Sequence, residues 1–504
     1  MNSLQVYNSL KREKETFQPI NEGRIGMYVC GPTVYSDVHL GNCRTFVSFD
    51  VIYRYLTYVG YKVRYVRNIT DVGHLVGDVD TGGEDKISKK ARLEQVEPME
   101  VVQRYTKGFH AMMDVFNTLP PSIEPRATGH IIEQIEMVQS IIDNGYGYEK
   151  NGSVYFDTAK FAQENEVYGK LSGRILDDLM SETRDNLKNQ SEKNHPSDFA
   201  IWIKADPTHL MRWNSPWSVG FPGWHLECSA MSTKYLGKTF DIHGGGNDLK
   251  FPHHENEVAQ NHGACGCAPA NYWLHTNMLL MNGRKMSKSE DNSITPEQLF
   301  TGESKHVSKG YTPMAIRFFM LQAHYRSTLD LNDEALQAAE KGYRKLMEAY
   351  DVLQKLEHPG EGTEGGLDKQ INKMLDLTHL DMSDDFNTPK AIAKLFAIVP
   401  KINSLGAGKL DFKDMTAETL ARLKQTFHDF IFDIFGLKSE SAIASIGGED
   451  DDDLMDGLMN LIIDMRQDAR ANKNWAISDK IRDTLQALKV QLKDGKEGTT
   501  WRKL

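Results

Sequence analysis

The pattern that most constrains the fold of this chain is a glycine-marked turn between strand-like and helix-like segments near the N-terminus. Residues 24–30 (RIGMYVC) predict a short buried strand that ends at Gly31-Pro32. A helix with one apolar face is predicted from about Leu40 to Tyr58, and residues 62–70 alternate as a second strand. Strand, glycine turn, helix and strand are typical of a nucleotide-binding α/β fold, whose ligands bind at the carboxyl ends of parallel strands.

The same glycine-rich, strand-like pattern resumes between Trp217 and Lys288. Between the two, residues 94–145 are mostly helical in pattern, and residues 146–215 hold short alternating segments and a polar run. We interpret 146–215 as part of an inserted domain with a mobile loop that splits one α/β domain. After about residue 300 the pattern is helical, with a flexible break at 359–366.

Size and composition narrow the class of protein. A chain of 504 residues is expected to form three or four domains. The N-terminus has no apolar segment of a secretory signal, and no run of about eighteen apolar residues occurs, so we expect a cytoplasmic protein without membrane contact. The net charge of −11 argues mildly against a protein coated in nucleic acid but allows a local basic face.

Two motifs that lie far apart in the sequence are suited to binding a polyphosphate. His39 and Gly41 lie where a strand passes into a helix, so the helix N-terminus can meet a phosphate and His39 can donate to it. Lys285 and Lys288, in the stretch KMSKS, can neutralise a departing pyrophosphate. Either motif alone is more often an ordinary turn or a solvated loop. Together, about 245 residues apart and each after strand-like sequence, they predict ATP-dependent chemistry.

A third motif, DIHGGGND, places three glycines after a predicted strand. Gly244 and Gly245 would let an adenine or ribose lie against the backbone, and Asp248 could accept hydrogen bonds from the ligand. A flexible loop is an equally good interpretation of this motif alone.

Metal-ligand spacing occurs in PHHENE, where His253 and Glu257 share a helix face. His254 with Glu257 fits as well, so spacing leaves the histidine open. Cys30 and Cys228 could complete a tetrahedral set if the fold brings them together. The remaining cysteines are interpreted as a surface turn and a core residue: Cys265 and Cys267, and Cys43.

Taken together, these residues resemble the cysteinyl-tRNA synthetase family of class I synthetases, over nearly the whole chain. The likeness rests on CGPTVY with HLGN, on PGWHLECSAM, HGGG and FPHHENE, on KMSKS without change, and on NWA, DG and GTTWR in the tail. The stretch from Cys228 to Glu257 is highly specific, whereas the helical middle is generic.

The resemblance implies roles for particular residues. It implies zinc ligands at Cys30, Cys228, His253 and Glu257, and thereby selects His253. It implies cysteine contacts at Thr70 and Trp224 and a pocket-shaping role for His243. The anticodon contacts that it implies are Arg470, Trp475, Asp479, Arg482 and Asp494.

Three positions depart from the family pattern. Asn42 replaces a histidine, so the phosphate contact is expected to rest on His39. Phe221 stands where the family usually has arginine, which puts a charge role there in doubt. Glu290-Asp291 follows the lysine loop and places two negative charges near the phosphates.

The implied fold is a Rossmann-like catalytic domain split by an insertion, then a helical bundle and a small anticodon-binding domain. The expected boundaries are catalytic first half, 1–120; inserted connective domain, 121–215; catalytic second half, 216–300; stem-contact region, 301–345; helical bundle, 346–446; acidic linker, 447–453; and C-terminal module, 454–504.

The implied function is that of a cysteine–tRNA ligase. The enzyme is expected to be a monomer and to use L-cysteine, ATP with Mg²⁺, one Zn²⁺ per subunit and tRNA(Cys). One alternative is the ligase that joins cysteine to a glucosamine-inositol in mycothiol synthesis, which lacks an anticodon module. Another is a zinc-stabilised nucleic-acid-binding protein without catalysis, which leaves His39 and the lysine loop without a purpose.

Overall fold

The computed structural model describes residues 3–73, 85–174, 193–286, 292–439, 459, 461–470, 474–487, 490–495 and 498–503. The chain divides into two compact units, Met1–Leu437 and Lys438–Leu504. Within these described ranges, no helix has the length and apolar character needed to cross a membrane.

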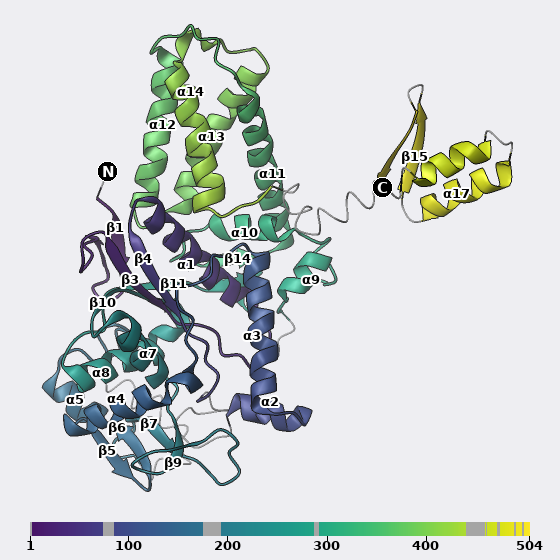
Figure 1. Cartoon of the computed structure of the whole chain (residues 1–504). Coiled ribbons are helices and arrows are strands. Elements are labelled where there is room, and N and C mark those ends of the chain that lie inside the picture. Colours follow the sequence, from purple (N-terminus) through teal and green to yellow (C-terminus); the bar gives the residue numbers. More distant parts are fainter. Residues whose placement is uncertain are drawn as a thin grey trace. The chain divides into compact units, whose positions relative to one another are not determined.

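A four-stranded parallel sheet forms the centre of the first unit (Figure 1). Its strand order is β11 (Ala270–Thr276), β10 (Phe240–Gly246), β3 (Arg24–Val29) and β4 (Lys62–Arg67). The strands are largely buried, as expected of a parallel sheet covered on both faces. Because all four run parallel, their carboxyl ends share one edge. The predicted strands at 24–30 and 62–70 are confirmed, the second ending earlier, at Arg67.

Three helices connect or cover the central strands. They are α1 (Leu40–Tyr58), α7 (Leu226–Leu236) and α8 (His253–Cys265). The predicted bounds of α1 are confirmed, and its N-terminus is capped by His39, whose Nδ1 accepts from the Asn42 amide at 3.3 Å. The connection from β10 to β11 runs through α8, so that this helix begins beside the carboxyl end of β10.

Between β4 and β10 the chain builds a second, antiparallel sheet of five strands. In spatial order these are β5 (Gly147–Lys150), β6 (Ser153–Phe156), β7 (Phe199–Lys204), β9 (Val219–Pro222) and β8 (Trp213–Asn214). The helices of this part of the chain are α2 (Lys86–Glu94), α3 (Pro98–Val115), α4 (Ile131–Asp143) and α5 (Thr158–Glu164). The polar run at 181–197 lies mostly outside the described residues.

Phe221 lies in β9 and is 1% exposed in the hydrophobic core of this region. A charged side chain at that buried position would lose its hydration without a partner, so phenylalanine suits the site as folded.

Short elements precede the sheet in the chain or follow it before the long helices begin. They are the N-terminal β1 (Gln5–Asn8) and β2 (Glu13–Thr16), then β12 (Leu279–Met281), β13 (Arg284–Lys285), α9 (Pro296–Thr301), α10 (Pro313–Leu321) and β14 (Leu329–Leu331).

Four long helices then stand side by side (Figure 1). They are α11 (Asp333–Lys355), α12 (Gly366–Ser383), α13 (Thr388–Gly406) and α14 (Ala417–His428). A break between α11 and α12 lies where 359–366 predicts one. Helix α11 begins at Asp333, which lies inside the segment 301–345 that was expected to form the stem-contact region.

The second unit contains α17 (Trp475–Ala487) and a hairpin of β15 (Val490–Gly495) and β16 (Gly498–Lys503). The acidic linker expected at 447–453 lies outside the described residues. Near the end of α8, Cys265 and Cys267 flank Gly266 in a left-handed turn and form a disulfide. Cys43 is fully buried in α1, which confirms it as a core residue.

Candidate metal centre and active site

Cys30 lies directly after β3 at the carboxyl edge of the central sheet. Its amide donates to the Gly244 carbonyl at 3.0 Å, which ties it to the neighbouring strand β10. The turn that follows passes very close to β4: a Cβ at Gly31 would lie 1.6 Å from the Asn68 carbonyl oxygen. Only glycine fits there, because any other residue would push the turn, and Cys30 with it, out of place.

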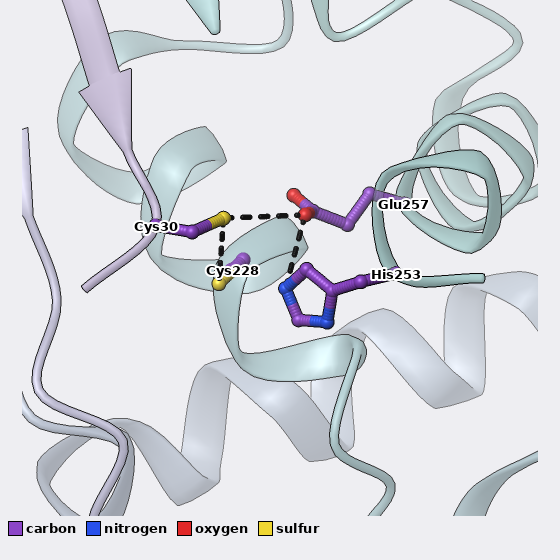
Figure 2. Close-up of side chains that lie close together, drawn as sticks. All are labelled: Cys30, Cys228, His253 and Glu257. Atoms are coloured by element: carbon purple, nitrogen blue, oxygen red, sulfur yellow. Dashed lines mark hydrogen bonds and ion pairs between the residues drawn. The ribbon is translucent and has the colours of Figure 1, made fainter. Parts of the chain in front are cut away.

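The other three predicted ligands come from two helices. Cys228 lies in the first turn of α7, and His253 and Glu257 lie one turn apart at the start of α8. Figure 2 shows the four side chains converging on one point. All four are buried, and one ligand atom from each lies within 4.8 Å of the others.

The separations within this set, which we call the cluster, are those of groups in contact. The Cys30 Sγ is 3.7 Å from the Cys228 Sγ and 3.6 Å from a carboxylate oxygen of Glu257 (Figure 2). That oxygen is 3.3 Å from Nε2 of His253. Two thiols, an imidazole and a carboxylate within this space can hold a tetrahedral zinc ion.

The second histidine of PHHENE also reaches the cluster. Cys30, His243, His254 and Glu257 form another group within 4.8 Å. His254 Nε2 lies 3.3 Å from the Cys30 Sγ, and its Nδ1 lies 2.9 Å from His275. The ambiguity between the two histidines is therefore present in the fold as well, and the set with two thiols is the one that the resemblance implies.

Burial controls the protonation of these groups. It raises the pKa of the Cys30 thiol well above its usual value and that of Cys228 to about 12. Burial also lowers the pKa of His254 well below its usual value, with nearby histidines adding to the effect. Without a cation the thiols therefore stay protonated, and a metal ion would reverse that preference.

The residues expected to contact cysteine flank the cluster. Trp224 is half-buried, with its ring centroid 4.8 Å from that of His253. Thr70 is buried just after β4, and its backbone pairs with Thr33 in the turn after Cys30. His243 lies behind the cluster, where its Nε2 is 2.8 Å from Glu257 and its ring stacks on Trp273.

Sequence reasoning missed Glu227, the neighbour of Cys228. Its side chain is 2% exposed, and its carboxylate accepts hydrogen bonds from Thr70 Oγ1 and from Asn68 Nδ2. Burial raises the pKa of Glu227 well above its usual value. One signal could have found it: between Trp213 and Thr233 it is the only Asp, Glu, Lys or Arg.

The first phosphate motif lies at the start of α1. His39 is exposed, and a Cβ at Gly41 would lie 3.0 Å from the His39 ring. Gly41 therefore makes room for His39 to fold back over the helix N-terminus, where free amides favour an anion.

The glycines of HGGG lie inside β10 rather than after it, which differs from the expected loop. A Cβ at Gly244 would meet the Phe49 ring at 2.2 Å, and one at Gly245 would meet His254 at 2.9 Å. Tight packing explains both glycines, and their contact with ATP stays a prediction. Asp248 follows in an exposed turn.

The lysine loop is only partly described. Lys285 is the last residue of β13 and is exposed, paired in register with Leu280 of β12. Lys288 and the two acidic residues after it lie outside the described residues.

The anticodon candidates all belong to the second unit. Trp475 is 58% exposed, and Arg482 forms an exposed ion pair of 3.1 Å with Asp479. Arg470 is the last described residue of a helical stretch that includes 461–470, and Asp494 lies in β15. An exposed tryptophan beside charged side chains suits the stacking of an unpaired base.

Comparison with known proteins identifies the family. Residues 16–341 match the tRNA synthetases class I (C) catalytic domain, and residues 379–439 match the DALR domain. A cysteine–tRNA ligase of Bacteroides thetaiotaomicron is 54% identical over 500 residues, covering 99% of each chain. One of Deinococcus radiodurans is 47% identical, covering 99% of this chain and 97% of the relative.

A solved methionyl-tRNA synthetase of Mycobacterium tuberculosis, in complex with methionyl-adenylate, shares the fold. Its TM-score is 0.55 at 14% identity, covering 82% of this chain and 89% of that chain. The split α/β fold predicted from the sequence is thereby confirmed, and the full-length likeness places the chain in one branch of that fold. This chain belongs to the cysteine–tRNA ligase family of class I tRNA synthetases.

Proposed function

We propose that this chain activates L-cysteine with ATP and transfers the cysteinyl group to tRNA(Cys). The observation that carries the proposal is the buried cluster beside Thr70 and Trp224 at the carboxyl edge of the sheet. Family membership and the full-length likeness to cysteine–tRNA ligases support it.

We assign one zinc ion per subunit to Cys30, Cys228, His253 and Glu257. The donor set fits that ion, because two thiols, an imidazole and a carboxylate lie within 4.8 Å of one another in a buried space. Bound zinc would supply affinity for a thiolate and lower the pKa of a substrate thiol. The hydroxyl of serine is a poor partner for such a site, which supports discrimination on the order of 10⁴ without an editing domain.

The chemistry of activation is an attack by the cysteine carboxylate on the α-phosphorus of ATP. A new P–O bond gives cysteinyl-adenylate while the bond to pyrophosphate breaks. We assign His39 and Lys285 to the developing charge, together with Lys288 of the same loop and Mg²⁺ on ATP. Gly41, Gly244, Gly245 and Asp248 are assigned to the nucleotide.

Transfer requires a hydroxyl of the terminal ribose of tRNA(Cys) to attack the carbonyl carbon of the adenylate, so that an ester bond forms, the bond to phosphate breaks and AMP leaves. We assign Arg470, Trp475, Asp479, Arg482 and Asp494 to the anticodon, and we expect a monomer that works in the cytoplasm. The glucosamine-inositol alternative predicts no such module. Lys438–Leu504, by contrast, is a compact unit of its own, and a cysteine–tRNA ligase matches over 99% of this chain.

The deciding experiment measures cysteine-dependent exchange between ATP and pyrophosphate, followed by charging of tRNA(Cys). Exchange with cysteine, at least about 10³-fold weaker exchange with serine, and about one zinc per chain are expected. Exchange without charging would favour the glucosamine-inositol ligase. No exchange with cysteine would overturn both enzymatic assignments.

A further inference from the structure

A carboxylate that the metal set does not use lies beside the cluster. Glu227 is the second residue of α7, next to Cys228, and its side chain is 2% exposed. Carboxylates are rarely buried this completely unless a cation or several hydrogen bonds compensate for the lost hydration. The hydrogen-bond and ion-pair partners of Glu227 therefore indicate whether its role is structural or lies in binding a ligand.

Only one of its two oxygens is satisfied. Oε1 accepts from the Thr70 hydroxyl and from Asn68 Nδ2 at 3.3 Å. Oε2 is buried and has no hydrogen-bond partner among the described residues. A satisfied structural carboxylate looks different: both oxygens of the buried Asp198 accept hydrogen bonds, from Thr158, Tyr148 and His195.

A negative charge on Glu227 also has no cationic side chain beside it. Among the described residues, no lysine, arginine or histidine forms an ion pair with it, and the charged groups that act on it are the acids Asp71 and Glu257. Once a divalent metal ion is bound, two cluster thiolates would balance its charge and leave none over for Glu227. A cation brought by a ligand is what this position lacks.

The proposed substrate carries such a cation. Cysteine has one positive group, its α-ammonium, separated from its sulfur by two carbon atoms. A cysteine held by its sulfur near Cys228 therefore places its ammonium within reach of the adjacent part of α7. Thr70, which the family resemblance associates with the substrate, already binds Glu227.

We propose that Glu227 binds the α-ammonium group of the amino-acid substrate through Oε2, while Thr70 and Asn68 hold its carboxylate in place. This proposal rests on the proposed function. The cluster would then recognise the thiol and Glu227 the amine, so that a thiol lacking the amine is bound less tightly.

The test compares cysteine with 3-mercaptopropionate, which has the thiol and carboxylate but no amine. Calorimetric affinities are measured without ATP for the zinc-loaded wild-type chain and for Glu227→Gln, which keeps the shape and removes the charge. The wild type is expected to bind cysteine about tenfold to hundredfold more tightly than 3-mercaptopropionate. In Glu227→Gln the affinity for cysteine should fall by that factor and the affinity for 3-mercaptopropionate should stay the same.

Asp198→Asn is the matched control, because it neutralises a buried carboxylate that is already satisfied and lies directly before β7, outside the cluster. Its ratio of the two affinities should equal that of the wild type. Equal losses for both thiols in Glu227→Gln, or an unchanged affinity for cysteine, would overturn the proposal. Failure of the wild type to bind cysteine would instead overturn the proposed function, so the two failures are distinguishable.

Discussion

The thiol half and the phosphate half of the candidate site are built in opposite ways. The thiol half is the cluster, with all four side chains buried and Cys30 and Cys228 belonging to a hydrophobic core that includes Tyr28 and Trp273. The phosphate half consists of exposed groups: His39 at the start of α1, Asp248 in a short turn and Lys285 at the end of strand β13.

The difference teaches how each half is positioned. The cluster is held by the packing of β3, α7 and α8 before any ligand arrives, so its geometry is part of the fold. The exposed groups are held by few packing contacts, so ordering them on a bound nucleotide would cost side-chain entropy. Changes in the thiol half should therefore affect metal content and cysteine binding together, whereas changes in the phosphate half should affect the reaction without changing metal content.

The largest effect is expected for Cys228→Ser. A serine hydroxyl is a poor zinc ligand, so zinc content and cysteine-dependent exchange should both fall, the latter by at least about 10³-fold. Metal analysis beside the exchange assay checks this. Cys43→Ala, at a buried cysteine outside the cluster, should keep its zinc. Full zinc occupancy in Cys228→Ser would mean that the ligands are wrongly assigned.

The phosphate half is tested by Lys285→Met, which keeps the length of the side chain and removes the charge. Exchange should fall by about 10²–10³-fold, because one charge opposite the leaving pyrophosphate is lost. Zinc content should not change, and Lys409→Met in an exposed loop should behave as wild type. Zinc loss in Lys285→Met would break the division between the two halves.

His39→Ala should have a smaller effect on the reaction, about 10²-fold in exchange, if His39 donates to the α-phosphate. It should also lower the free energy of unfolding by about 1 kcal/mol, because His39 caps α1. Urea unfolding of the same preparation separates the two effects. An unchanged exchange rate together with a lower stability would mean that His39 acts only as a helix cap.

The smallest effect is expected for Asn42→Ala. The Asn42 side chain completes the cap by accepting from the His39 amide at 3.4 Å, a long hydrogen bond. Its loss should change exchange less than about threefold and stability by about 0.5 kcal/mol. An exchange rate as low as that of His39→Ala would show that the phosphate contact is shared between the two residues.

The parts of the fold that local pattern controls could be predicted from the sequence. The bounds of α1 follow from the apolar residues on one of its faces, and β3 follows from a short, largely apolar stretch that ends at a glycine turn. The pairing of His253 with Glu257 is equally local, because residues four apart share a helix face. Convergence of Cys30 and Cys228, which are 198 residues apart, depends on the sheet order and came only from the family resemblance.

Two errors of interpretation have physical causes. The glycine run at 244–246 was taken to follow a strand because glycine is common in loops, but in β10 it makes room for Phe49 and His254. Glu227 was missed because it lies in no recognisable sequence pattern. Its role depends on hydrogen-bond partners that are distant in the sequence, Asn68 and Thr70. Periodicity reports which way a side chain faces but not which segment it meets.

The strand order β11-β10-β3-β4 has a consequence for the growing chain. Two neighbouring strands of the sheet, β3 and β4, leave the ribosome early, whereas β10 follows only after the whole second sheet has been made. Until β10 has been synthesised, one edge of β3 has no partner strand, and Cys30, directly after β3, remains a free thiol. Translation across the insertion would therefore delay assembly of the cluster and of any metal ion bound there, and a pause at that point would prolong the exposure of an unpaired strand edge.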